Sequence, residues 1–362
     1  MHSADLFELH GRSLSELEQF ALTLGAPAYR GRQLAHWLYQ RGATSFDEMT
    51  DLPADLRRTL AARAQLTTLA PVAEVSADGG DTVKYLLRLA DGPTVETVFM
   101  RYEDGRRSVC ISTQVGCAMG CTFCATGLAG LTRNLTAGEI VDQVLHVWRE
   151  RGERPTNVVF MGMGEPLANY EATLKAVRLL NAPYGAGIGM RQLTVSTVGL
   201  VPQIRRLAAE RLQLTLAVSL HAPNDALRTS LVPVNRRWPV AELLAASADY
   251  VTMTRRRISF EYVLMEGVND TADLGAALGE LLASTADAGV SPAMYHVNLI
   301  PWNPVYGLQY RRPPRRRVDA FAAAVRRRGV AVTVRVERGI EIDAACGQLR
   351  RTHADSLATS HG

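Results

Sequence analysis

The stretch that decides the fold is Cys117-Ala-Met-Gly-Cys121-Thr-Phe-Cys124, in which three thiols follow a C-x3-C-x2-C spacing. Thiolates are the usual protein ligands of iron–sulfur clusters, and a cubane 4Fe–4S cluster needs one ligand for each iron. Three neighbouring cysteines can bind three irons and leave the remaining iron open to a small molecule. The glycine and polar residues indicate a loop. We therefore predict an open-site 4Fe–4S cluster bound by Cys117, Cys121 and Cys124.

Two other interpretations of these cysteines are weaker. Structural zinc usually takes two separated C-x2-C pairs, or one pair with two histidines, which together close a tetrahedron. The chain has no second pair, and the nearest downstream histidine, His146, falls in a predicted helix. Buried thiols without a metal would suit an apolar segment better than this loop. The spacing favours the cluster.

The composition is that of a globular protein from a reducing compartment. Of 362 residues, 47% are hydrophobic and 21% charged, which suits one large domain with a smaller appendage. The formal net charge of +4 does not by itself indicate nucleic acid. We find no apolar run long enough for a membrane span and no signal peptide, so we expect a cytoplasmic protein without a membrane partner. Five cysteines, three of them clustered, suit metal or catalytic roles better than disulfides.

The N-terminal part of the chain has helical patterns. Ser13-x-x-Glu16 is a capping-box motif, and residues 30–41 carry Leu34, Trp37 and Leu38 at helical spacing. The segment is either a structural helical cap or a module that recognises the substrate, and the sequence favours neither.

A β-hairpin follows the helical part. Residues 83–89 and 94–100 are rich in β-branched and alternating residues, and Asp91-Gly92 between them is a hairpin signal. Glu96 lies inside the second predicted strand. A carboxylate in a strand usually faces solvent, so Glu96 gains interest only from the resemblance described below.

Short apolar runs alternate with amphipathic helices from residue 109 to about residue 336. About six strand–helix units of this kind indicate a parallel, partly closed barrel. In such folds the active site lies at the C-terminal ends of the strands. The predicted strands are 109–112, 157–161, 193–196, 214–219, 257–264 and 295–300.

Four polar or glycine-rich motifs follow the predicted strands. Each alone would most often be turn chemistry, because Gly, Pro, Ser and Asn dominate turns. Four in succession at the expected active rim could together hold the carboxylate, amine and ribose of one cofactor. The motifs are Gly162-Met-Gly164-Glu165-Pro166, Ser196-Thr-Val-Gly199, Ser219-Leu220-His221-Ala-Pro and Asn298-Leu-Ile-Pro-Trp302-Asn303-Pro.

Two cysteines lie outside the cluster motif. Cys346 precedes a glycine, which suits an exposed thiol, and Cys110 lies in the strand that leads to the cluster loop. Two further thiols near a metal cluster suggest thiol chemistry.

The cysteine run, with an aromatic residue before its last cysteine, resembles the signature of the radical S-adenosylmethionine (SAM) superfamily. Further motifs, from about residue 20 to residue 349, look like those of the RlmN family, the 23S rRNA adenine-C2 methyltransferases. These motifs are Ser112-Thr-Gln114-Val-Gly116-Cys117, Cys124-Ala-Thr-Gly127, Arg133-Asn134-Leu135-Thr136, Phe160-Met-Gly-Met-Gly-Glu-Pro166, Ser219-Leu-His-Ala-Pro-Asn-Asp225 and Ile342-Asp-Ala-Ala-Cys-Gly-Gln-Leu349.

The resemblance implies an α/β fold, a partial (β/α)6 TIM-like radical SAM barrel with a small N-terminal helical domain and a β-hairpin extension. The expected division is a helical RNA-recognition domain over residues 1–70, the β extension over 71–105, the catalytic barrel over 106–349 and a flexible tail over 350–362.

The resemblance also implies a mechanism. Carbon 2 of adenine is electron-poor and cannot attack the methyl group of SAM in an ordinary displacement. In the family a cysteine, here Cys346, first accepts a methyl group from one SAM, and a second SAM is cleaved to a 5′-deoxyadenosyl radical that activates the S-methyl group. After addition to adenine, Glu96 would accept the ring proton, and Cys110 would form a transient disulfide with Cys346 that releases the RNA. The segment from Glu96 up to Cys110 is one residue longer than the family pattern leads us to expect.

Cofactors, partners and SAM contacts follow from the same resemblance. The cofactors would be a 4Fe–4S cluster and two SAM molecules per turnover. The partners would be 23S rRNA and an electron donor such as flavodoxin, with the protein acting as a monomer. Whether an adenosine beside a tRNA anticodon is also methylated stays open. The residues expected to contact SAM are Gly164, Glu165, Ser196, Ser219, Leu220, His221 and Asn303.

Three alternatives stay open. The Cfr type methylates carbon 8 of adenine, and the segments 295–300 and 339–343 have features of that branch, whereas Trp302-Asn-Pro and Gly164-Glu-Pro166 favour carbon 2. A radical SAM enzyme with a non-RNA substrate, or a zinc-stabilised RNA-binding protein, would also contain the cysteine run.

The arginine clusters 255–257, 315–317 and 326–328 suit either phosphate contacts or solvated helix faces.

Overall fold

The computed structural model describes residues 6–66, 69–285, 289–305 and 307–335. Within these residues one sheet has ten strands in the order β14-β13-β12-β11-β10-β9-β6-β5-β4-β3. From β6 to β14 all neighbours along this order are parallel, and from β3 to β6 they are antiparallel. The strands of the sheet are β3 (Ala70–Ala77), β4 (Thr82–Arg88), β5 (Thr94–Arg101), β6 (Arg107–Cys110), β9 (Asn157–Phe160), β10 (Leu193–Thr197), β11 (Thr215–Ser219), β12 (Ile258–Leu264), β13 (Tyr295–Pro301) and β14 (Ala331–Val334).

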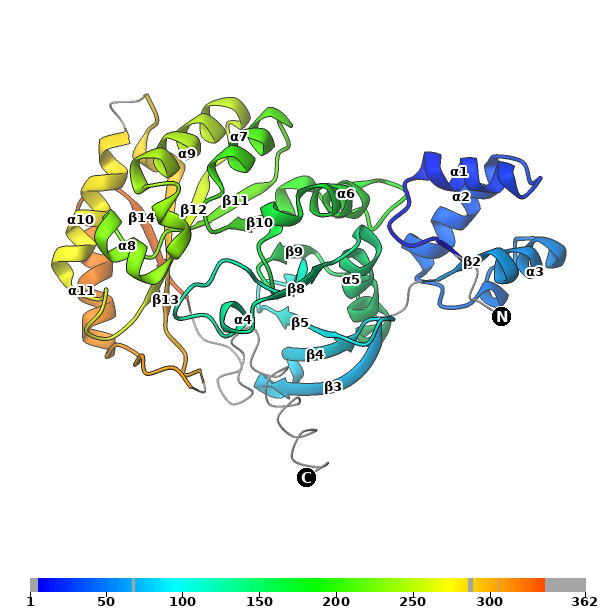
Figure 1. Ribbon diagram of the computed structural model, residues 1–362, viewed down its shortest axis with the longest axis horizontal. Coiled ribbons are helices and arrows are strands. Elements are labelled where there is room, and N and C mark those ends of the chain that lie inside the picture. The colour runs from blue at the N-terminus through cyan, green and yellow to red at the C-terminus, as the bar shows by residue number, and fades with distance from the viewer. Residues whose placement is uncertain (1–5, 67–68, 286–288, 306, 336–362) are drawn as a thin grey trace.

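The parallel strands confirm the predicted barrel pattern. Each predicted strand from residue 109 onward corresponds to one of β6 and β9 to β13, and β14 extends the parallel run by one strand. Helices cover the outer face of the parallel sheet (Figure 1). They are α5 (Ala137–Arg151), α6 (Tyr170–Asn181), α7 (Val201–Ala209), α9 (Val240–Thr254), α10 (Ala272–Ala283) and α11 (Arg315–Arg326). The short helix α8 (Asp225–Leu231) instead lies at the C-terminal ends of β10 and β11, to which its Arg228 is hydrogen-bonded.

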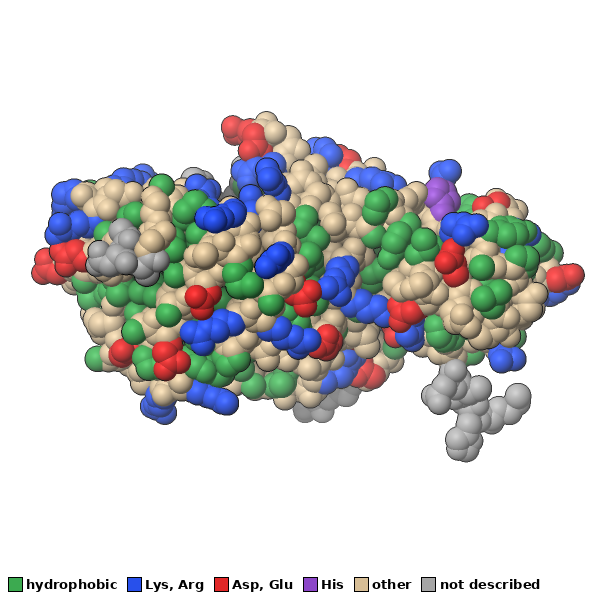
Figure 2. Space-filling model, turned by 90° about the horizontal axis from the view of Figure 1, so that it is seen from above, with side chains coloured by type: hydrophobic (Ala, Val, Ile, Leu, Met, Phe, Trp, Pro, Cys, Tyr) green, Lys and Arg blue, Asp and Glu red, His purple; other side chains and the backbone are tan. Residues whose placement is uncertain are grey.

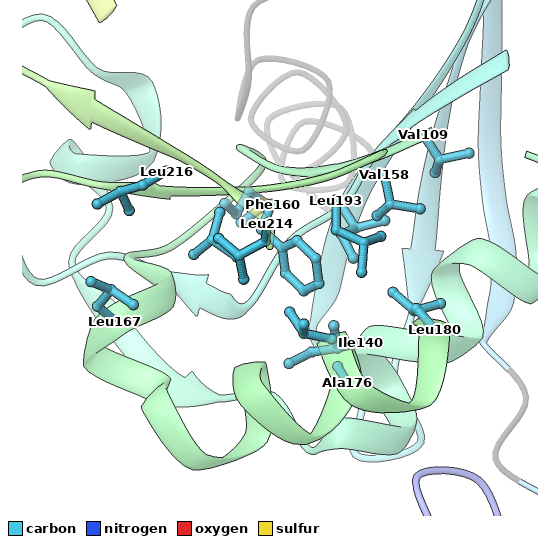
Figure 3. Packing of buried hydrophobic residues seen from close by; sticks show 14 of the residues in the cluster. Val109, Ile140, Val158, Phe160, Leu167, Ala176, Leu180, Leu193, Leu214 and Leu216 are labelled. Carbon is cyan, nitrogen blue, oxygen red and sulfur yellow. The ribbon is translucent and has the colours of Figure 1, made fainter. Parts of the chain in front are cut away.

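The core lies between the parallel strands and the helices outside them. Val109, Val158 and Phe160 on β6 and β9 point toward Ile140 of α5 in Figure 3, together with residues of α6. All of the named side chains are at most 1% exposed. Burying one such side chain contributes about 1.5–3 kcal/mol, so this layer provides the rigid support from which the strand ends project.

The predicted hairpin is confirmed and joins the barrel sheet directly. Strands β4 and β5 pair antiparallel, with Lys84 opposite Val98 and Leu86 opposite Glu96. Gly92 in the connection has φ +104, a conformation that favours glycine. Because β5 also pairs with β6, the hairpin is an antiparallel continuation of the parallel sheet rather than a detached extension.

The N-terminal segment forms a helical lobe at one end of the molecule (Figure 1). It contains α1 (Leu14–Thr23), α2 (Tyr29–Ala35), a π-helical turn (His36–Arg41), α3 (Ala54–Arg63) and a two-stranded sheet of β1 (Phe7–Glu8) and β2 (Ala64–Gln65). The capping box of α1 is confirmed, since the Ser13 hydroxyl accepts from Glu16 N and the Glu16 carboxylate accepts from Ser13 N. The predicted helix over residues 30–41 changes from α to π geometry at His36.

Close backbone packing joins the lobe to the barrel. A Cβ on Gly11 would lie 2.4 Å from the backbone nitrogen of Gly138 in α5, so no side chain fits at this crossing. The Lys175 ammonium of α6 lies 2.8 Å from the Glu16 carboxylate of α1. Gln40 donates a hydrogen bond to the carbonyl of Pro183 at 2.6 Å. The lobe is therefore held against α5 and α6, away from the C-terminal ends of strands β10 to β13.

Candidate active site

The predicted cysteine loop lies within a small hairpin that follows β6. Strands β7 (Gln114–Gly116) and β8 (Leu131–Asn134) pair antiparallel, and the loop between them contains the short helix α4 (Ala125–Leu128). Cys117 N donates to the Gly130 carbonyl at 2.8 Å. Gly116 has φ +82, and a Cβ there would lie 1.9 Å from the Gly130 oxygen. The hairpin therefore requires glycine at the residue before the first cysteine.

Contacts from distant parts of the chain fix the rest of this loop. Thr122 N donates to the Leu231 carbonyl at the end of α8 at 3.0 Å. The Trp302 indole donates to the Phe123 carbonyl at 3.4 Å, and the Phe123 ring packs edge-on against His221 with ring centroids 4.8 Å apart. Residues that follow β11 and β13 thus hold the cysteine loop over the C-terminal ends of the strands.

The three thiols of the loop are close enough to interact electrostatically. Burial raises the pKa of Cys121, and the neighbouring Cys124 and Cys117 raise it further. Burial likewise raises the pKa of Cys117 to about 11. Thiolates in this loop therefore need a positively charged group to stabilise them, as the iron of a cluster does. In the described ranges no group of three His, Cys, Asp or Glu side chains could hold a single metal ion. A cubane cluster has a different requirement, because each thiolate binds a different iron.

A cavity of about 280 Å³ opens beside the cysteine loop. Cys124 and Phe123 of the loop line it on one side, and Glu96 and Cys110 of the sheet line it on another. Asn303, after β13, also contributes to the wall. The cavity therefore contains candidate residues from four separate parts of the sequence.

The sheet wall of this cavity carries charged groups. Strand register aligns Lys84, Val98 and Cys110 across β4, β5 and β6. Glu96 is two residues from Val98 and shares its face of β5. The Lys84 ammonium lies 3.3 Å from the Glu96 carboxylate, with side-chain exposures of 0% and 1%. Burial raises the pKa of the Cys110 thiol to about 11, while Arg335 acts to lower it.

The motif after β9 is folded tightly against the cysteine hairpin. Gly164 has φ +102, and a Cβ there would lie 2.6 Å from the side chain of Gln114. Glu165 is buried, and its two carboxylate oxygens accept from Leu167 N at 3.1 Å and Val198 N at 2.7 Å. Burial raises the pKa of Glu165 to about 7. The Glu165 carboxylate thus joins the ends of β9 and β10.

His221, after β11, is a neutral side chain built into the loop structure. Its φ of +60 is uncommon for a residue with a side chain. Its Nδ1 accepts from Val263 N at 3.1 Å, and its carbonyl accepts from the Asn269 amide at 2.9 Å. Burial, with the nearby Arg228 charge, lowers the pKa of His221 to about 3. The ring can therefore accept and pack near neutral pH without carrying a charge.

The remaining predicted SAM contacts also lie at strand ends. Ser196 Oγ donates to the Phe160 carbonyl at 2.7 Å, which ties β10 to β9. The Ser219 carbonyl accepts from Arg228, and Leu220 N donates to the Glu261 carbonyl at 3.0 Å. The Asn303 side chain accepts from Arg312 at 3.3 Å. These residues therefore share the rim at which the cysteine loop lies.

The comparisons with known proteins agree with this geometry. Residues 111–275 match the radical SAM superfamily, and residues 7–66 match the ribosomal RNA large subunit methyltransferase N-terminal domain. The probable dual-specificity RNA methyltransferase RlmN of Pelotomaculum thermopropionicum is 53% identical, over 96% of this chain and 92% of that protein. The corresponding protein of Symbiobacterium thermophilum is also 53% identical, over 94% and 91%. The chain belongs to the RlmN family.

A solved structure extends this result to the fold. The radical SAM methyltransferase from Sphaerobacter thermophilus superposes with a TM-score of 0.89 at 52% identity, over 94% of this chain and 98% of that one. The resemblance inferred from the motifs is therefore confirmed, as is the radical SAM fold. As an RlmN-family member, the chain is a SAM-dependent radical methyltransferase, and the family implies SAM and a 4Fe–4S cluster as its cofactors. Among the described helices, none combines the length and apolarity that crossing a bilayer requires.

The structure brings only part of the predicted RlmN-type site into view. Glu96, Cys110, Cys124 and Asn303 line one cavity. Cys346, with the motif 342–349, lies outside the described residues. The roles of individual site residues consequently stay predictions.

Sequence reasoning missed two charged residues of this site, Lys84 and Arg228. Lys84 is one of only two lysines in the chain, and it lies inside a predicted strand, which is a signal that a buried partner exists. Arg228 lies three residues beyond Asp225, the end of a recognised motif, and had no distinguishing signal.

Three of the nine arginines in the clusters seen in the sequence form salt bridges within the described residues. Arg317 contacts Asp270 at 3.0 Å, Arg315 contacts Asp319 at 3.1 Å, and Arg328 contacts Glu280. On the face shown in Figure 2, basic and acidic side chains are interspersed. The exposed pairs of Arg315 and Arg328 contribute about 0–1 kcal/mol each, whereas the Asp270 side chain of the third pair is buried. Phosphate contact by these arginines stays a prediction.

Proposed function

We propose that this RlmN-family enzyme methylates carbon 2 of a specific adenosine in 23S rRNA, in the peptidyl-transferase centre. The observation that carries the proposal is the single cavity that Cys124, Cys110 and Glu96 line together. A cluster-binding loop, a resolving thiol and a carboxylate at one cavity are three of the protein groups that this chemistry requires, and the methyl-carrying thiol of Cys346 is the fourth. Carbon 2 of adenine is not nucleophilic, so a methyl group must be delivered to it as a carbon radical.

The proposed roles of the chain's own residues follow the order of the reaction. Cys117, Cys121 and Cys124 hold the cluster. When bound, the cluster supplies the electron that cleaves SAM reductively to a 5′-deoxyadenosyl radical. The Cys346 thiolate first accepts a methyl group from another SAM, so two SAM molecules are used per turnover. The Cys346 methyl group then loses a hydrogen atom and bonds to the adenine carbon.

Glu96 and Cys110 complete the proposed reaction. Glu96 accepts the proton that leaves carbon 2, and the Lys84 ammonium lies 3.3 Å from its carboxylate. Cys110 attacks the sulfur of Cys346, which forms a disulfide and breaks the bond between that sulfur and the methylene carbon on the RNA. The methylene takes up a proton to become the methyl group, and the cluster, when bound, would take back the one unpaired electron that radical addition leaves. A thiol reductant must then restore both cysteines. The raised pKa of Cys110 suits a thiol that stays protonated until the adduct forms.

The proposed SAM contacts are Gly164, Glu165, Ser196, Ser219, Leu220, His221 and Asn303. Their common position at the strand ends supports this assignment. Because both Glu165 oxygens already accept from backbone nitrogens, a SAM ammonium would have to use the remaining lone pairs of that carboxylate.

The proposal extends to substrates and partners. The two relatives are named probable dual-specificity RNA methyltransferases, which supports a tRNA adenosine as a second substrate. An electron donor of the flavodoxin class would reduce the cluster, and the protein would act as a cytoplasmic monomer.

The test uses reconstituted enzyme, unmethylated large-subunit rRNA and SAM with a deuterated methyl group, under anaerobic conditions. Mass spectrometry after chromatography of the RNA digest separates 2-methyladenosine from 8-methyladenosine. We expect 2-methyladenosine, whereas 8-methyladenosine would place the enzyme in the Cfr-type branch. SAM cleavage without RNA methylation would mean that the substrate is not this RNA.

Two variants test the assigned thiols. Cys346→Ala should abolish RNA methylation while 5′-deoxyadenosine is still released. Cys110→Ala should instead accumulate an RNA–protein adduct, visible as a band that only nuclease removes. Full methylation by the Cys346 variant would refute the proposed mechanism but not the fold.

A further inference from the structure

Arg228 is a completely buried cation at the strand ends. It projects from α8 and is 0% exposed. Its guanidinium donates to the carbonyls of Val198 at 2.6 Å, Ser219 at 3.1 Å and Leu220 at 3.1 Å. It also donates to the Asn235 side chain at 2.8 Å. One arginine thus ties together the chain ends that follow β10 and β11.

The hydrogen-bond partners of Arg228 satisfy four of its five N–H groups but do not neutralise its charge. All four are neutral oxygens, and in the ranges given above no carboxylate forms a salt bridge with Arg228. Taking an ion out of water costs several kcal/mol unless an opposite charge compensates it. Burial lowers the pKa of Arg228 to about 10, so the guanidinium still carries its charge near neutral pH. The fold therefore retains a positive charge for which a counter-charge is expected.

The counter-charge lies on the side of the cysteine loop. Cys121 and Asp225 are the groups whose negative charge would stabilise the Arg228 cation, and Asp225 is exposed to water. The loop rests on the helix that carries Arg228, because Thr122 N donates to the Leu231 carbonyl and Gly120 lies next to Pro233. A cluster bound by three thiolates carries net negative charge, and reduction adds one more electron to it. Arg228 therefore lies on the helix that supports the loop whose bound group would become more negative during the reaction.

The geometry points to Arg228 as a positioning residue that holds the cluster electrostatically and makes its one-electron reduction easier. This inference rests on the proposed function, since it takes Cys117, Cys121 and Cys124 as the cluster ligands. A buried unit charge near a redox centre acts through a low effective dielectric and is little screened by salt. We expect its loss to change the equilibrium constant for reduction by about tenfold, which corresponds to about 59 mV for one electron.

The experiment compares variants of the full-length, reconstituted protein without RNA. Arg228→Met removes the charge at similar volume, and Arg228→Lys keeps the charge but loses the forked donor geometry. Arg256→Met is the matched control, because Arg256 donates to Thr215 at the opposite end of β11 from Ser219. The readouts are iron and sulfide per chain, the thermal unfolding temperature, and the midpoint potential from a redox titration followed by electron paramagnetic resonance.

The expected result separates charge from packing. Arg228→Met should lower the midpoint potential by about 59 mV, which corresponds to an about tenfold smaller equilibrium constant for reduction. For Arg228→Lys this equilibrium constant should differ less than about threefold from that of the wild type. Arg256→Met should leave the potential unchanged. If Arg228→Met does not fold, Arg228→Gln, which keeps an amide donor for the carbonyls but no charge, is measured in its place.

Two outcomes would overturn the inference. Wild-type potential in a folded, cluster-loaded Arg228→Met or Arg228→Gln protein would mean that Arg228 only ties the strand ends together. Equal loss of iron from the Lys and Met variants would show the same. A wild-type chain that binds no iron and sulfide would instead refute the cluster assignment on which both proposals depend.

Discussion

The buried ion pair between Lys84 and Glu96 gives the sharpest quantitative prediction. Both side chains are at most 1% exposed, and the charged atoms are 3.3 Å apart. Removing one partner of a buried pair leaves a charge that water no longer solvates and this counter-ion no longer balances. Such changes destabilise a protein by about 3–5 kcal/mol. We therefore expect Lys84→Met to lower the free energy of unfolding by about 3–5 kcal/mol.

A double-mutant cycle isolates the pair from other effects of the substitutions. Glu96→Gln alone should also destabilise, because it replaces a charged partner of the buried ammonium with a neutral one. The combination of Lys84→Met with Glu96→Gln should cost less than the sum of the two single changes, by about 2 kcal/mol or more. Lys175→Met is the matched control. Lys175, the other lysine, pairs with Glu16, and because both side chains are 36% exposed, this pair should contribute only about 0–1 kcal/mol.

The assay is equilibrium denaturation of the full-length chain in urea, followed by far-UV circular dichroism under reducing, anaerobic conditions. The same variants are tested for SAM cleavage and RNA methylation, so that loss of fold and loss of the proton acceptor are distinguished. The double variant should fold and release 5′-deoxyadenosine without methylating RNA. A Lys84→Met protein within about 1 kcal/mol of the wild type, or additive single effects, would refute the reasoning.

Three further predictions concern local structure. Gly116→Ala should disrupt the β7–β8 hairpin and abolish iron binding, because its Cβ would lie 1.9 Å from the Gly130 oxygen. Gly130 has φ +67, and a Cβ there would have no atom within 4 Å, so Gly130→Ala should cost only about 1–2 kcal/mol and keep the iron. Iron content and thermal unfolding measure both effects. The folded-state pKa of His221, about 3, lies below its ordinary value of 6.5. Between these two pH values the unfolded chain therefore binds a proton that the folded chain does not, so the free energy of unfolding should fall as the pH decreases from 6.5 to about 3. His221→Gln should reduce that slope by up to about 1.4 kcal/mol per pH unit in denaturation series, and an unchanged slope would contradict a buried neutral ring. Ser13→Ala should remove the α1 cap and cost about 1 kcal/mol by urea denaturation, whereas exposed Ser15→Ala should be nearly neutral.

Local signals predicted most of the fold correctly. The capping box at Ser13, the hairpin at Asp91-Gly92 and the strands from residue 109 onward all depend on residues that are close in the sequence. The change to π geometry at His36 was not predicted, since helical periodicity does not distinguish an α turn from a π turn. The sequence also did not show that the hairpin continues the barrel sheet, because that depends on the pairing of β5 with β6.

The candidate site shows the same division between local and tertiary information. The sequence by itself determined the cysteine loop, because the spacing of Cys117, Cys121 and Cys124 lies within one short segment. It also placed the motifs of Glu165 and His221 at strand ends. Only the tertiary structure decided what those side chains contact: Glu165 joins two backbone segments, and Lys84 pairs with Glu96. Arg228 became visible for the same reason, because burial and electrostatic environment depend on partners that the chain brings together only when it folds.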